Sequence, residues 1–143
     1  MSTEHSESMP SAQRLAEELS AFDDRIAILE SEVRAGAGET GLPGLVDETI
    51  GIVNGLLCAY ATHAGKPMPV SDDPLQVFKV FVKGDPSLNA IRDNVRELVY
   101  YRNCLAEGRA DALPTNPALM TAHTARHIYL YLRTRCAQEQ RLP

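Results

Sequence analysis

Tryptophan is absent from this chain of 143 residues, and aromatic residues make up only 6% of it. Cysteine is scarce as well: Cys58, Cys104 and Cys136 show neither the even count of a disulfide scaffold nor the spacing of a zinc site. No apolar run approaches the roughly 18–20 residues that span a bilayer. The polar, acidic start resembles neither a secretory signal nor a transit peptide. We therefore expect a globular domain in the cytoplasm, with no membrane span.

Charge is distributed unevenly along the chain. Residues 1–73 contain four Lys/Arg and thirteen Asp/Glu, a net charge of −9, whereas residues 74–143 contain ten and six, a net charge of +4. The sum, −5, argues against a protein whose whole surface binds nucleic acid. Such a change of sign favours either charged partners or two oppositely charged parts of one fold, and both interpretations remain open.

Glycine and proline clusters divide the chain into helical segments joined by short turns. Apolar residues recur at helical spacing in the segments between the clusters. The pattern predicts an all-α bundle of four long helices with one additional short helix. The long helices are expected at about 10–35, 45–64, 88–107 and 118–140, and the short one, which a strand could replace, at 75–82. Residues 1–9 are expected to form a flexible acidic tail on a single domain, 10–143.

Gly51 and Gly55 make one side of the second long segment small and smooth. The opposite side carries an apolar stripe that includes Leu57. This pattern predicts a central helix with a neighbour packed closely over the glycines.

Two patterns that suggest ligand chemistry have simpler explanations. Gly36, Gly38 and Gly41 spell G-x-G-x-x-G, but a helix precedes them where a dinucleotide fingerprint needs a strand, so we expect an inter-helix loop. His123 and His127 are one helical turn apart and could share a metal. No glutamate follows the first histidine and no acidic third ligand lies nearby in the segment. We therefore predict no metal site and no cofactor.

The last segment has its main apolar stripe on one side and a mixed surface on the other. The mixed surface is expected to hold Met120, His123, His127, Leu130 and Tyr131. Apolar residues interleaved with histidines on the outer side of a helix are typical of a subunit contact. We expect a homodimer or a hetero-complex with a protein partner through these five residues.

Arg102 is the strongest anomaly in the third long segment, because helical projection places it near the centre of the apolar stripe. A guanidinium cannot remain unpaired in a core. It must extend to solvent, meet a carboxylate such as Glu107, or line a cleft. A structural ion pair and a binding arginine are both consistent with the sequence.

The segment around Arg102, ELVYYRNCLAEG, resembles the signature of the HEPN superfamily of small helical bundles. These commonly act as ribonucleases in toxin–antitoxin and defence systems, or as helper domains beside nucleotidyltransferases. Arg102, Asn103, Ala106 and Gly108 match the family pattern, and Glu107 stands where its histidine belongs. The resemblance implies arginine steadying a phosphate and histidine moving protons during attack by a ribose hydroxyl. A carboxylate at that position repels phosphate and can neutralise Arg102.

The resemblance leads to a HEPN-like domain of RNA metabolism or defence. Arg102, Asn103 and Glu107 are the candidate catalytic residues, in a cleft between the third and fourth long helices. Further positive charge for RNA is expected from Arg96, Arg109, Arg126 and Arg133. We expect a degenerate, metal-independent ribonuclease at most, and more readily an inactive RNA-binding relative. The alternative is a non-catalytic interaction or assembly protein, an adaptor or chaperone that binds a protein partner.

Overall fold

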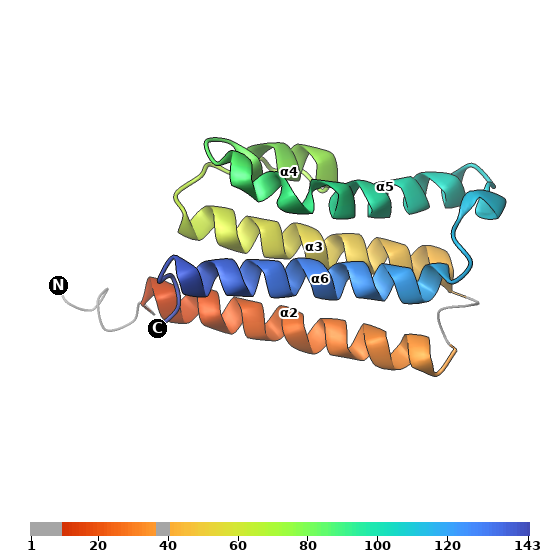
Figure 1. The fold of residues 1–143 in the computed structure, drawn as a ribbon, viewed down its shortest axis with the longest axis horizontal. Coiled ribbons are helices and arrows are strands. Elements are labelled where there is room, and N and C mark those ends of the chain that lie inside the picture. The colour runs from red at the N-terminus through yellow and green to blue at the C-terminus, as the bar shows by residue number, and fades with distance from the viewer. Residues whose placement is uncertain (1–9, 37–40) are drawn as a thin grey trace.

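The computed structural model describes residues 10–36 and 41–143, and this part of the chain is all-α, as predicted (Figure 1). It contains five α-helices and two short 3₁₀ helices, and no strand occurs in the described ranges. In chain order the elements are α2 (Ser11–Arg34), α3 (Leu42–His63), α4 (Pro74–Val82), η2 (Pro86–Ile91), α5 (Arg92–Ala106), η3 (Ala110–Ala112) and α6 (Pro117–Gln138). The tail predicted at 1–9 lies outside the described residues.

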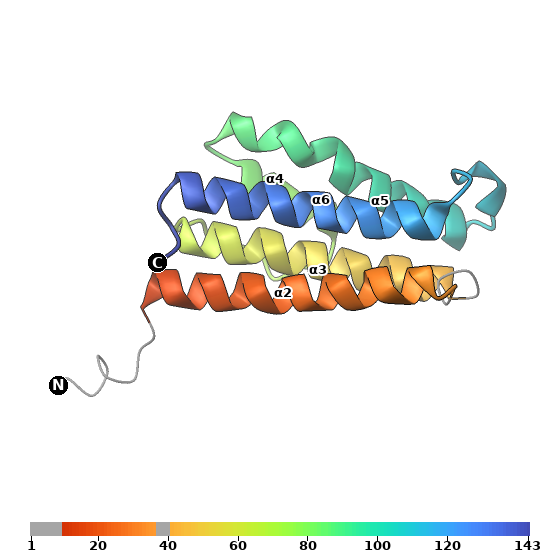
Figure 2. The same cartoon turned by 60° about the horizontal axis from the view of Figure 1, so that its bottom comes forward.

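The helices α2, α3 and α6 pack against one another, and α4 and α5 cover the remaining side of α3. Figures 1 and 2 both show α6 between α2 and α5, running antiparallel to each of them. The core is formed by the apolar stripes that the sequence predicts. Leu15, Leu19, Ile26 and Leu29 of α2 are buried, as is Leu57 of α3.

The segment from Pro74 to Val82 is a helix rather than a strand. Asp73 is its N-cap: the carboxylate accepts a hydrogen bond from the Leu75 amide at 3.1 Å. Val77, Phe78 and Phe81 fall on one side at helical spacing and are buried. The alternation of apolar and polar residues, which would suit a strand, is therefore outweighed by two helical signals. These are the N-cap at Asp73 and the helical spacing of the buried apolar residues.

The third long helix was predicted as continuous from residue 88, but its first part is the 3₁₀ helix η2. Leu88 and Ile91, three residues apart, are both fully buried. A 3₁₀ helix repeats every three residues, so it places both side chains on the same side. The α-helical part begins only at Arg92. Likewise α3 begins at Leu42, before the predicted residue 45, with a proline in its first turn.

Of Gly51 and Gly55 in α3, one has the close neighbour that the sequence predicts. A Cβ built on Gly55 would lie 2.3 Å from Cζ of Phe22 in α2, whereas one built on Gly51 would meet nothing within 4 Å. By length and composition α3 would suit a membrane span, although half of its most apolar window is buried in the bundle. Packing against its neighbours accounts for the buried half of that apolar character.

Candidate functional site

Arg102 is half-buried and faces the first turns of α3. It lines a small pocket of about 210 Å³ whose other walls are Pro43, Val46, Asp47, Leu105 and Ala106. Its guanidinium makes no hydrogen bond or ion pair with any residue in the described ranges. The predicted cleft for Arg102 between the third and fourth long helices, α5 and α6, is therefore wrong. A helical projection identifies the inward side of α5, but it cannot tell which neighbouring helix covers that side.

The other two motif residues point elsewhere. Asn103 and Glu107 are exposed, and Glu107 is the C-cap of α5. Among the described residues, no hydrogen bond or ion pair joins either of them to Arg102. Arg102 thus faces α3, whereas Asn103 and Glu107, four residues apart, lie on the exposed side of α5.

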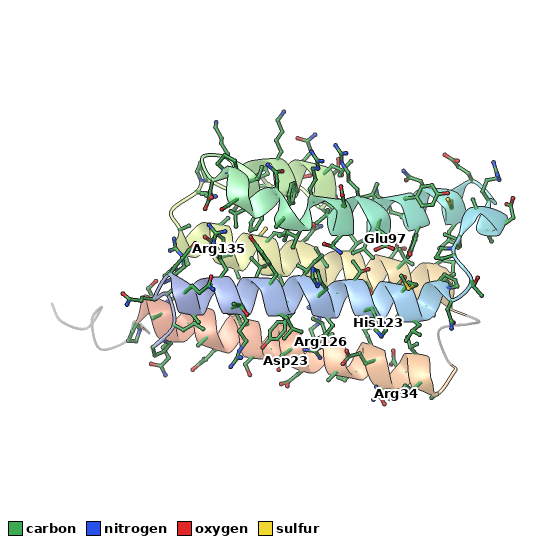
Figure 3. All side chains as sticks on the ribbon, viewed as in Figure 1. Asp23, Arg34, Glu97, His123, Arg126 and Arg135 are labelled. Carbon is green, nitrogen blue, oxygen red and sulfur yellow. The ribbon has the colours of Figure 1, made fainter. Side chains whose placement is uncertain are left out.

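The contact between α5 and α6 is bridged by the carboxyl group of Glu97, whereas the sequence predicts a cleft lined by arginines there. Glu97 of α5 accepts a hydrogen bond from Thr124 of α6 at 2.8 Å and one from Tyr101 at 2.7 Å (Figure 3). Burial and the hydrogen bond to Glu97 raise the pKa of Tyr101. This contact is a structural one in which the Glu97 carboxyl group joins α5 to α6.

Arg126, predicted to offer positive charge to RNA, is neutralised by α2. Its guanidinium lies 2.6 Å from Asp23 Oδ1 and 2.9 Å from Glu30 Oε1, at the seam between α6 and α2 that Figure 3 shows. It also lies over the ring of Tyr129, 5.3 Å from the centroid. The hydrogen bonds to Glu30 and Asp23 outweigh burial and raise the pKa of Arg126. Arg126 therefore makes structural ion pairs with α2, and its binding to RNA stays a prediction.

The remaining predicted RNA-binding arginines differ in their surroundings. Arg109 is exposed and pairs with exposed Asp111 at 3.1 Å. Arg96 and Arg133 are exposed and have no ion pair within the part of the chain that the structure describes. Exposed pairs such as Arg109–Asp111 contribute little energy and do not prevent an arginine from meeting a phosphate.

A polar cluster that the sequence did not predict lies at the end of α6. Glu139 accepts hydrogen bonds from Tyr60 at 2.7 Å, Arg135 at 2.5 Å and Arg141 at 2.6 Å. Burial alone would raise the pKa of Glu139, but these three donors lower it to about 2. Burial and the bond to Glu139 raise the pKa of Tyr60 to about 12. These hydrogen bonds tie α3 to the end of α6.

Four of the five predicted interface residues are exposed on one side of α6. Met120, His123, His127 and Leu130 form this surface, which we call the α6 outer face. Tyr131 does not belong to it: its hydroxyl donates to the Ser87 carbonyl at 3.3 Å and accepts from Arg135. Tyr131 is half-buried against η2 and is therefore not grouped with the other four residues.

An open groove of about 790 Å³ lies between α2 and α3. Phe22, Gly55, Cys58 and Ala59 form its floor, and Arg14, Glu18, Arg25 and His63 stand along its edges. Burial raises the pKa of the Cys58 thiol, which keeps it protonated. The small residues of α3 were the available signal for this groove.

No group of three or more His, Cys, Asp or Glu residues suited to a metal ion occurs in residues 10–36 and 41–143 of a single chain. Comparison with models of protein families, with curated proteins and with solved structures finds no match to this chain.

Proposed function

We propose that this protein is a non-catalytic helical interaction protein that binds another protein chain through the α6 outer face, in the cytoplasm. One observation supports the proposal above the others. Six large apolar side chains are exposed in the described ranges, and Met120 and Leu130, 37% and 51% exposed, are the two that share a helix. Apolar side chains grouped on one exposed surface are typical of a protein–protein contact.

Site-specific photo-crosslinking in native cells tests this proposal. A photoreactive residue at Leu130 should yield a discrete crosslinked product, because the partner covers the α6 outer face. Leu75 of α4 provides a matched control, since it is also an exposed leucine, 42% exposed, on a different helix. A product at Leu75 but not at Leu130, or none at either position, would contradict the proposal. The mass of the product distinguishes a second copy from a different protein.

RNA binding by a HEPN-like domain is the second candidate function, and Arg102 favours it. A half-buried guanidinium without an ion pair in the described ranges keeps its full capacity to bind a phosphate. Arg96, exposed on the same helix, adds positive charge. Asp47 in the wall of the Arg102 pocket and the separation of Asn103 and Glu107 from Arg102 argue for binding without cleavage.

A further inference from the structure

The α6 outer face has a spacing that reads the same in both directions. Met120, His123, His127 and Leu130 are separated by three, four and three residues, so the pattern is symmetric about position 125. All four side chains are exposed, and they lie within the uninterrupted helix Pro117–Gln138. The two histidines form the centre of the pattern and the two apolar residues its ends.

A helix face of this kind is complementary to itself. In a two-fold symmetric contact, if residue i of one copy meets residue j of the other, then j also meets i. Suppose that two α6 helices lie antiparallel, with the two-fold axis passing the exposed side of the helix at the level of residue 125. Each His123 would then lie opposite His127 of the second copy. Each Met120 would likewise lie opposite Leu130. Four imidazoles would then gather at the centre, with an apolar pair on each side.

The surroundings of the histidines permit a cation there. Histidines at i and i+4 project from the same side of a helix and can bind one ion together. The nearest cationic side chain on the sequence, Arg126, is neutralised by Asp23 and Glu30 and therefore does not repel a metal ion. Thr134, the next residue along this side, is small, so a second helix can approach closely.

We propose that two copies of this chain assemble through the α6 outer face around one divalent transition-metal ion, held by His123 and His127 of both copies. This inference rests on the proposed function of that face and names its partner. Neutral imidazole is a good ligand for Zn²⁺, which takes four ligands in tetrahedral geometry. One chain supplies only two of them, so the site is incomplete without the second copy. Burial of Met120 against Leu130 adds apolar stabilisation on both sides of the ion.

Light scattering coupled to size-exclusion chromatography tests the proposal on the full chain, with Zn²⁺ alone as the probe. Zn²⁺ at one ion per two chains should shift the mass from 15.7 kDa to twice that value. A chelator should reverse the shift. His123→Ala and His127→Ala should each abolish the response, and circular dichroism should show that both variants keep their helices, because the replaced side chains are exposed. His63→Gln, which removes an imidazole from α3, is the matched control and should respond to Zn²⁺ like the unaltered protein.

The other outcomes separate this inference from the proposed function. Zinc-independent assembly that Leu130→Glu disrupts but His123→Ala does not would overturn the metal site and leave the interaction function standing. Binding of Zn²⁺ without a change of mass, or an equal loss of response in His63→Gln, would overturn the shared site. A chain that stays monomeric with and without Zn²⁺ and gives no crosslinked product at Leu130 would overturn both.

Discussion

The ring of Phe22 lies directly over Gly55, where a Cβ would come within 2.3 Å of Phe22 Cζ. No such neighbour exists at Gly51, one turn earlier in the same helix. Replacing glycine by alanine inside a helix normally stabilises it by about 0.5–1 kcal/mol. Gly51→Ala should therefore raise the free energy of unfolding by about that amount. Gly55→Ala should gain less or nothing, because Phe22 has to move.

Urea unfolding of both alanine variants measures this difference, and Phe22→Ala supplies the control background. Once the ring is removed, Gly51→Ala and Gly55→Ala should have similar effects. An equal gain at both positions with Phe22 present would show that the ring does not pack on α3.

A second prediction concerns Arg126. Arg126→Ala would leave Asp23 and Glu30 without their common partner, so we expect a loss of about 1–3 kcal/mol in the free energy of unfolding. Arg133→Ala, an exposed arginine on the same helix, should change it by about 0.5 kcal/mol or less. Thermal unfolding of the two variants at matched salt compares them directly. Equal losses of unfolding free energy in the two variants would show that the Arg126 ion pairs do not stabilise the fold.

A third prediction concerns pH. The folded protein holds the pKa of Glu139 at about 2, below the ordinary value of 4.5. A depressed carboxyl pKa stabilises the fold above the unfolded pKa, and the contribution is lost as the pH falls toward the folded pKa. Glu139→Gln should therefore destabilise the protein at pH 7, by about 2 kcal/mol for the weakened charged hydrogen bonds. The difference from the unaltered protein should shrink between pH 4.5 and pH 2. A difference that is constant over this range would argue against the Glu139 cluster.

A fourth prediction compares two leucines. Leu57 is fully buried, so Leu57→Ala should cost about 2–5 kcal/mol. Leu130 is 51% exposed, and Leu130→Ala should change the free energy of unfolding by about 0.5 kcal/mol or less when chelator keeps the chain monomeric. Chemical denaturation at low protein concentration gives both values. A large loss at Leu130 under these conditions would mean that the α6 outer face is covered within the single chain.

A fifth prediction addresses RNA. Because Arg102 has no ion pair in the described ranges, Arg102→Ala should cost only about 1 kcal/mol of stability. If the second candidate function holds, the same change should weaken binding of single-stranded RNA at low salt, where phosphate contacts are strongest. Fluorescence anisotropy measures the binding, with Arg34→Ala on α2 as the control. We expect no cleavage from Glu107→His, which restores the HEPN pattern, because Glu107 is exposed at the end of α5 and has no contact with Arg102 in the described ranges. Metal-independent cleavage by this variant would contradict that separation. Undetectable RNA binding at low salt would eliminate this function.

Local signals carried most of what the sequence predicts correctly. The spacing of apolar residues in α6 identifies its buried side, and Ala118, Ala122, Ala125 and Leu132 are all buried. The cap at Asp73 marks the start of α4. Both depend on residues within a few turns of one helix. The exposed α6 outer face follows from the same periodicity.

What the sequence could not provide is the identity of the neighbouring helix. Arg126 meets Glu30 across 96 residues, and Tyr60 meets Glu139 across 79. Periodicity determines the side of a helix on which a residue lies, whereas pairing depends on how the helices are ordered in space. For the same reason the inward direction of Arg102 was predicted, but its position against α3 instead of α6 was not.

The position of α6 between α2 and α5 has a consequence for biosynthesis. Domains generally begin to fold while the ribosome is still extending the chain. Here the helix that contacts both α2 and α3 is translated after all the other helices of the bundle. A nascent chain carrying only α2 to α5 therefore lacks the contacts that α6 makes with α2 and α3. Closure of the core must wait until α6 has left the exit tunnel.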